Sequence, residues 1–455
     1  MFVSFNLLTF LAWVFISTFL PGMVLSFGIL RKEASLSGLE KALIGCALGF
    51  FLLPMIPFLL YLGLGIKFSH MVATVSVVAL YAVSIICFFF SRAYEGFKLP
   101  QNFKLPQKIT FKPEHALPAA LAVLLVLTFL IRIGSYGPVF QELDPYYYTY
   151  PAYQLISAGE NIFDDQTSWY PEVVVNHRII PALSYLEATW YSLYSGGAPA
   201  DNMLLATIAS VYPPIAAVLA VFFAYLLVSL ISKREWGLLA GGLASFAPIF
   251  IYKLAAGEQE VQPYAFFALF FFYAMYALAL KKKDYLTIQD GKPVFSNDLI
   301  IPVLAGIAYA ALTLGSSTPV LVVMSVVLFV AFQAAALFLR DEDGNGLLDL
   351  VVVNAVILLI GPILANSVLQ SIFSGGGLSF GYSLTYLAGV IAAATLYAMK
   401  FFFKGRASSA VVLCGIAIIV LLAVAFTPLG DLIKGPAQRG FGIAQYNAPL
   451  DRTIA

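Results

Sequence analysis

The sequence predicts an all-α, polytopic membrane protein with about twelve transmembrane helices. Of its 455 residues, 61% are hydrophobic and only 11% are charged, whereas soluble domains carry about 25% charged residues. Mean hydropathy is +0.90, and apolar runs of roughly 18 residues or more, the length that crosses a bilayer, recur from end to end. The net charge of +1 and the lack of a charged tail give no indication of a nucleic-acid partner.

The predicted spans follow one another along the whole chain. The first is too long for the apolar core of a signal peptide and lacks a basic leader, so we expect a retained helix. The cysteines lie inside apolar runs, where packing is their expected role. The expected spans are 5–30, 42–66, 70–91, 116–133, 203–231, 236–256, 261–280, 299–317, 319–339, 350–373, 381–403 and 408–427.

Lysine and arginine in the connections predict the orientation, because short cytoplasmic loops are enriched in both. With twelve spans, every basic cluster falls on one side: residues 31–41, 92–115, 233–234, 281–283, 340 and 400–406. That side is predicted to be cytoplasmic. The other side is then external and receives a large first loop (134–201), the turns near 258–260 and 374–380, and the C-terminal stretch.

A first group of acidic residues begins the large external loop. Glu142 and Asp144 form an acid-x-acid pair directly after a span, and Pro145 restricts the backbone of Asp144. Two such carboxylates can bind one hard cation. The alternative is a solvated loop with interfacial tyrosines.

A second acidic group, Glu258-Gln259-Glu260, follows Gly257 between two apolar spans. Acids this close to the hydrocarbon boundary are costly unless they face water or a partner. A minimal polar turn is the alternative, but Gly-Ser would serve that purpose. The pair is therefore a second candidate for a cation site.

Three basic residues on the external side are candidates for binding phosphate. His177 and Arg178 lie in the large loop and can make charge-assisted contacts with a phosphate. Lys253 lies near the outer end of its span; we expect it to extend toward the interface, with a contact to phosphate as the alternative.

Taken together, these residues resemble the catalytic subunit of oligosaccharyltransferase in its archaeal form. Asp144-Pro145-Tyr146 matches the family's first motif, and Glu258-Gln259-Glu260 followed by an apolar helix matches the second. Thr453-Ile454-Ala455 matches the first three positions of a third motif, whose glutamate would come next. The family usually has an arginine at the position of Ile251.

The resemblance covers residues 116–455 and implies a multi-helix glycosyltransferase of the GT-C type. Residues 1–115 would be an extension of three membrane helices with a basic cytoplasmic loop. The family's C-terminal soluble domain would be absent, so we expect an incomplete catalytic domain, in a chain that is either inactive alone or a fragment.

The resemblance implies an enzyme of the plasma membrane whose catalytic face is external. It would transfer an oligosaccharide from a dolichyl phosphate or pyrophosphate carrier to asparagine in a sequon. Asp144, Glu258 and Glu260 would hold Mn²⁺ or Mg²⁺, with Glu142, Lys253, Thr453 and Ile454 as secondary candidates. The alternatives are a transferase that mannosylates Ser or Thr, one that elongates a lipid-linked glycan, a secondary transporter, and a structural membrane protein.

Overall fold

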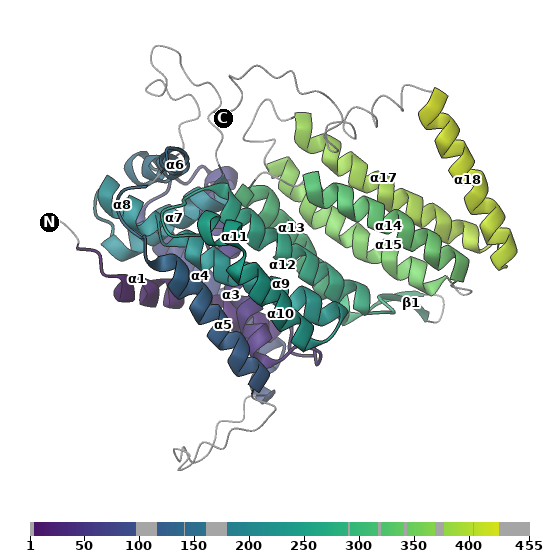
Figure 1. Cartoon of the computed structure of the whole chain (residues 1–455), viewed down its shortest axis with the longest axis horizontal. Helices are drawn as coiled ribbons and strands as arrows, with labels where there is room; N and C mark the ends of the chain where they lie inside the picture. The colour runs from purple at the N-terminus through teal and green to yellow at the C-terminus, as the bar shows by residue number, and fades with distance from the viewer. Residues whose placement is uncertain are drawn as a thin grey trace. The chain divides into compact units, whose positions relative to one another are not determined.

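The computed structural model describes residues 4–96, 116–140, 142–160, 180–289, 292–316, 320–340, 344–368, 377–403 and 405–426. Almost all of these residues are helical, which confirms the predicted all-α class (Figure 1). Ten helices among them are long and apolar enough to cross a membrane. The chain divides into two compact units, one of residues 1–327 with 352–388 and one of residues 328–351 with 389–455.

The ten candidate membrane helices coincide with ten of the twelve predicted spans. The predicted span 236–256 is divided into α10 (Arg234–Phe246) and α11 (Pro248–Lys253), and span 408–427 corresponds to α18 (Arg406–Phe426). The division occurs at Ala247, which is extended, because the residue before a proline avoids the helical conformation. The total of twelve crossings stays a prediction.

The N-terminal helices pack with unusually close backbones. Helix α1 (Leu7–Val14) continues through a π-helical turn into α2 (Leu20–Ile29), followed by α3 (Gly38–Leu64) and α4 (His70–Phe90). A Cβ atom added to Gly22 would lie 2.1 Å from the carbonyl oxygen of Gly45, and one added to Gly49 would lie 1.9 Å from that of Thr18. Small residues permit this approach, which favours helix association in membranes.

Helix α3 also packs into the core of the first unit. There α9 (Tyr212–Ile231), α12 (Val261–Lys281) and α13 (Ile300–Ser316) run side by side (Figure 1). Phe50 of α3 stacks on Tyr264 with ring centres 5.5 Å apart and meets Phe267 edge-on at 5.3 Å. The N-terminal helices are therefore an integral part of this unit.

The predicted external loop contains two helices, α6 (Asp144–Ala158) and α7 (Pro181–Ser195), which the sequence did not indicate. Helix α7 is buried along most of its length. The Trp190 indole N–H donates to the Thr18 hydroxyl at 3.0 Å, which ties α7 to the N-terminal helices. The Pro, Tyr and Trp residues of α7 are typical of a loop, so the sequence did not predict a helix there. In the structure its small and aromatic side chains are buried on several faces of the helix.

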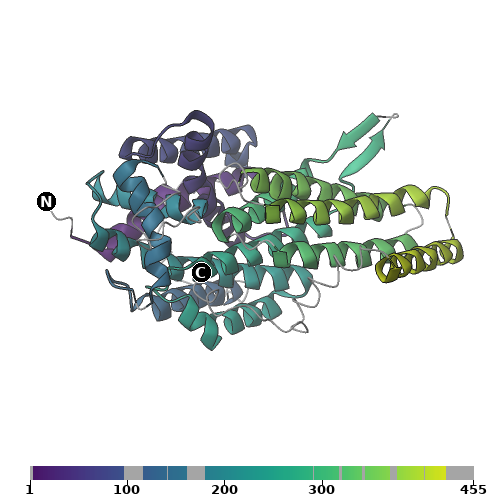
Figure 2. The same cartoon turned by 90° about the horizontal axis from the view of Figure 1, so that it is seen from above.

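Two short strands connect α12 to α13. Strands β1 (Leu286–Gln289) and β2 (Lys292–Phe295) pair antiparallel, with Leu286 opposite Phe295. Figure 2 shows this hairpin projecting from the ends of the two helices. It places a polar connection on the side that carries the lysines at 281–283.

The second unit contains parts of α14 (Val320–Arg340), α15 (Asn345–Leu358) and α17 (Gly377–Lys400), together with α18. Lys400 is only 5% exposed, and its ammonium donates to the Phe338 carbonyl at 2.7 Å and to the Ser409 hydroxyl at 3.3 Å. A buried ammonium needs such partners. Lys400 therefore links α14, α17 and α18 within this unit.

Candidate functional site

The first acidic group lies between α5 (Ala116–Ile133) and α6. Pro145 occupies the first turn of α6, where its missing N–H has no helical partner to lose. Asp144 begins the helix and is exposed, and its carboxylate has no partner among the residues that the structure describes. Glu142 precedes the helix by two residues and is half-buried.

The second acidic group is held by backbone hydrogen bonds from three directions. The Ala256 N–H donates to the Arg132 carbonyl at 2.8 Å, and the Gly257 N–H donates to the Ser210 carbonyl at 3.1 Å. The Tyr212 hydroxyl donates to the Glu260 carbonyl at 2.7 Å. Gly257 has a φ of +89°, a conformation that favours glycine. The turn is thereby fixed on α5, α9 and the residues before α9.

These two groups meet. Carboxylate oxygens of Glu142, Glu258 and Glu260 all lie within 4.8 Å of one another. The Lys253 ammonium, at the end of α11, lies 3.3 Å from Glu142, 3.5 Å from Glu258 and 3.4 Å from Glu260. The Tyr252 hydroxyl donates to Glu142 at 2.7 Å. We call Glu142, Glu258, Glu260 and Lys253 the acid cluster.

The carboxylates of the acid cluster differ in their electrostatics. Burial raises the pKa of Glu258 and Glu260, which are each 3% exposed, and Lys253 opposes this increase. The negative charge of Glu142 further raises the pKa of Glu258. The hydrogen bond from Tyr252, aided by Lys253, lowers the pKa of Glu142. Three carboxylates thus share one ammonium, an arrangement with an excess of negative charge.

The structure places the carboxylates of Glu258 and Glu260 together, and their role as cation ligands stays a prediction. Glu142, a secondary candidate, belongs to the acid cluster, whereas Asp144 is not part of it. Lys253 was expected to extend toward the interface; its side chain is 27% exposed and points into the carboxylates instead. His177, Arg178, Thr453 and Ile454 lie outside the described residues.

Arg132 is a residue that the sequence prediction missed. It is 1% exposed in the last turn of α5, and its guanidinium donates to the carbonyls of Thr128 at 3.1 Å and Ser245 at 2.7 Å. It therefore supports the end of α10 before the break, while its own carbonyl holds Ala256. An arginine inside an apolar span was the available signal, because such residues have a specific role by default.

Comparison with known proteins places this chain in a family. The family model described as "Oligosaccharyl transferase STT3, N-terminal" matches residues 115–445, which include both acidic groups. The chain belongs to the STT3 family of oligosaccharyltransferases. The match begins beside α5, so α1 to α4 precede the matched region.

Relatives of known name agree with this assignment. One relative is subunit STT3A of dolichyl-diphosphooligosaccharide–protein glycosyltransferase from rice (Oryza sativa subsp. japonica). The two proteins are 31% identical over 165 residues, an alignment that covers 34% of this chain and 20% of the rice protein. Its fold is similar to the apo oligosaccharyltransferase of Archaeoglobus fulgidus, with a TM-score of 0.58, 19% identity, and coverage of 75% of this chain and 41% of that one.

The fold is also similar to the A. fulgidus enzyme AglB in complex with an inhibitory peptide and a dolichol-phosphate. That match has a TM-score of 0.55 and 20% identity, and it covers 72% of this chain and 39% of the other. The chain thus spans about two fifths of the archaeal enzyme and a fifth of the rice protein. At these identities the archaeal structures establish the similarity of the fold, a multi-pass membrane architecture.

Proposed function

We propose that this protein transfers an oligosaccharide from a dolichyl phosphate or dolichyl pyrophosphate carrier to asparagine in a protein sequon. The acid cluster carries the proposal: three carboxylates share one ammonium, within the region matched by the STT3 family. The similarity to an archaeal enzyme that was solved with a dolichol-phosphate and a peptide supports a lipid-linked donor and a peptide acceptor.

A divalent cation, Mn²⁺ or Mg²⁺, is part of this proposal. The donor set fits, because carboxylate oxygens are the ligands that these hard cations prefer. Glu258 and Glu260 supply two carboxylates that the protein already holds in place. Asp144, whose carboxylate is exposed and has no partner among the described residues, supplies the third. Glu142 remains paired with Lys253, because the hydrogen bond from the Tyr252 hydroxyl already orients the Glu142 carboxylate.

Such a cation supplies Lewis-acid stabilisation of negative charge on the departing phosphate. The chain's own residues bind and orient the reactants. His177 and Arg178 make charge-assisted hydrogen bonds to the phosphate of the carrier. Carboxylates of the site accept hydrogen bonds from the acceptor amide, and that contact positions a poor nucleophile for attack.

We further propose that the acid cluster faces the exterior of a plasma membrane. Basic residues concentrate in the connections on the opposite side, which favours the cytoplasm for those connections. Helix α12 begins directly after Glu260 and ends at Lys281, so its length of 21 residues, about 30 Å, separates the two sides.

Two amide substitutions in the full-length protein test this assignment. Asp144→Asn should lower transfer of glycan to a sequon peptide by at least about a hundredfold, because a metal ion contributes several kcal/mol to such reactions. Glu142→Gln should lower it by less than about tenfold, since its exposed pair with Lys253 contributes little. The measurement is glycopeptide formed per unit of protein in reconstituted membranes.

Membrane insertion and thermal stability serve as controls, so that a misfolded variant is not scored as inactive. Full activity of Asp144→Asn would refute the proposed ligand set. The reverse order of effects, with Glu142→Gln inactive and Asp144→Asn active, would assign Glu142 to the cation instead.

A further inference from the structure

A polar cavity lies near the end of α12 that is opposite the acid cluster, outside the proposed reaction site. It has a volume of about 410 Å³ and lies where α2 and α4 end and α13 begins. Glu33 lines this cavity, and its carboxylate pairs at 2.7 Å with the ammonium of Lys282, which lies just after α12. The charged residues that line the cavity are Arg31, Lys32, Glu33, Arg92 and Asp298. We call it the headgroup cavity.

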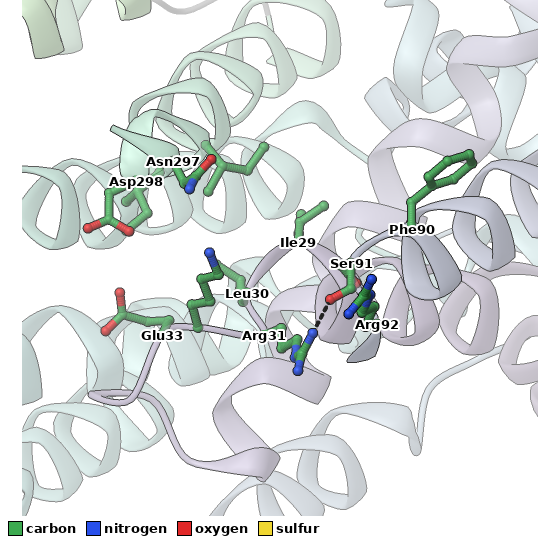
Figure 3. Close-up of a pocket in the computed structure, with 13 residues that line it drawn as sticks. Ile29, Leu30, Arg31, Glu33, Phe90, Ser91, Arg92, Asn297 and Asp298 are labelled. Carbon is green, nitrogen blue, oxygen red and sulfur yellow. Dashed lines mark hydrogen bonds between the residues drawn. The ribbon is translucent and has the colours of Figure 1, made fainter. Parts of the chain in front are cut away.

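Two arginines and two carboxylates of the headgroup cavity lie apart from each other. In Figure 3 the guanidinium groups of Arg31 and Arg92 lie beside Ser91, whereas the carboxylates of Glu33 and Asp298 lie at the other end. Asn297 lies next to Asp298. A ligand that fills the cavity therefore meets cations at one end and hydrogen-bond acceptors at the other.

Some of these side chains are already held by the protein. Arg31 donates to the Ser91 carbonyl and pairs with Glu95 at 2.7 Å. Glu33 accepts from the Ser35 hydroxyl at 2.6 Å in addition to its pair with Lys282. These contacts preorganise Arg31 and neutralise Glu33.

Other lining side chains are available to a ligand. Within the described parts of the chain, the side chains of Lys32, Arg92 and Asp298 have no hydrogen-bond or ion-pair partner. Arg92 lies two residues after the end of α4 and has a φ of 55°, in the left-handed region that non-glycine residues rarely adopt. An exposed, unpaired arginine in this conformation suits a charged ligand, because strained residues concentrate at functional sites.

The surroundings of the headgroup cavity favour a lipid. Ile29, Phe90 and Ile300 line it beside the charges, and Phe90 is 87% exposed at the end of an apolar helix. The cavity belongs to the side of the molecule that carries the lysines and arginines, where positive side chains meet anionic lipid headgroups. A free anion would use the cations but not the exposed phenyl ring.

We propose that the headgroup cavity binds the phosphate of a membrane phospholipid whose headgroup also carries hydroxyl or ammonium donors. Arg92 binds the phosphate beside the preorganised Arg31, and Lys32 of the same lining supplies a further positive charge. Asp298 accepts hydrogen bonds from the headgroup donors, and Phe90 contacts the acyl chain. The site is formed jointly by residues before the region matched by the family and by residues within it.

Native mass spectrometry of the full chain in a neutral detergent tests this site. The probes are dioleoylphosphatidylglycerol, dioleoylphosphatidylcholine and inorganic phosphate. We expect phosphatidylglycerol to bind more tightly than phosphatidylcholine, whose choline group lacks hydrogen-bond donors, and we expect inorganic phosphate not to compete. The double variant Lys32→Gln/Arg92→Gln should weaken phosphatidylglycerol binding by at least about tenfold.

The matched control is Lys233→Gln/Arg406→Gln, which removes one exposed lysine and one exposed arginine from the same basic side, outside the cavity. It should bind phosphatidylglycerol like the unmodified chain. Asp298→Asn should weaken phosphatidylglycerol binding a few-fold and leave phosphatidylcholine unchanged. Each variant is compared with the parent chain in thermal stability without added lipid.

Three results would overturn the proposal. One is unchanged binding of phosphatidylglycerol to Lys32→Gln/Arg92→Gln. Another is an equal loss in the control variant, which would mean general attraction of anionic lipid to a basic surface. The third is full competition by inorganic phosphate, which would identify a site for a free anion.

Discussion

Two pairs of buried glutamates, near opposite ends of α12, differ in how their charge is compensated. Glu33 and Glu40 lie on the basic side and are 5% and 2% exposed; Glu258 and Glu260 are each 3% exposed. Glu33 has Lys282 as its own cation. Glu40 has Arg234 at 3.1 Å.

Glu40 illustrates a carboxylate whose hydrogen bonds are satisfied for structural reasons. It accepts from the Ser37 N–H at 2.6 Å, completes the capping box of α3, and accepts from the Tyr225 hydroxyl at 3.0 Å. Glu258 and Glu260 instead share one lysine with Glu142. Burial is therefore similar for these four glutamates, and they differ in the ratio of carboxylates to cations, on which the proposed cation site rests.

The largest expected effect comes from removing the shared cation. Lys253→Met should lower the free energy of unfolding by about 3 kcal/mol without divalent cations, because it leaves buried carboxylates unpaired. Mn²⁺ should restore most of this loss by taking the place of the ammonium. Thermal unfolding of the purified chain with and without Mn²⁺ measures both quantities.

Lys253→Arg keeps the positive charge and is the matched control, with a much smaller expected loss. If Lys253→Met lowers the free energy of unfolding, relative to the unmodified chain, by the same amount with and without Mn²⁺, then Lys253 has a purely structural role.

A smaller effect is expected on the opposite side. Glu40→Gln should cost about 2 kcal/mol, because the amide loses the charge that holds Arg234 and weakens the cap of α3. Mn²⁺ should not restore this loss, since Glu40 shares no cation with other carboxylates. Rescue of Glu40→Gln by Mn²⁺ in the same unfolding experiment would remove the distinction between the two pairs.

The smallest effect is expected at Glu142, the most exposed member of the acid cluster. Glu142→Gln should change the free energy of unfolding by less than about 1 kcal/mol, because partly exposed ion pairs contribute little. The amide can still accept the hydrogen bond from Tyr252. A loss as large as that of Lys253→Met would show that Glu142 is the principal partner of the lysine.

Hydropathy was sufficient to predict most of the architecture. Ten predicted spans coincide with helices, and the short connection at Gly257 indicated Glu258 and Glu260 as candidates, whose carboxylates lie close to that of Glu142. Hydropathy did not predict the helices that form without a long apolar run. Helix α7 is buried by contacts with α3 and α4 that no local pattern records, and Pro248 interrupts a run that is otherwise long enough to cross.

All four members of the acid cluster were candidates from the sequence, but their meeting could not be predicted, because they come from distant parts of the chain. Glu142 and Lys253 are separated by 111 residues and meet only after α5, α10 and α11 pack. The sequence motif favoured Asp144, which follows Glu142 by two residues and is exposed at the start of α6. The choice between them depends on side-chain geometry that a spacing of two residues does not determine.

Calorimetric titration of the purified full chain with Mn²⁺ tests the central claim most directly. The account predicts one saturable site that is lost in Glu258→Gln/Glu260→Gln and retained in the exposed pair Glu95→Gln/Glu235→Gln. Saturable binding that is unchanged in Glu258→Gln/Glu260→Gln would contradict it, since the cation would then bind elsewhere in the protein.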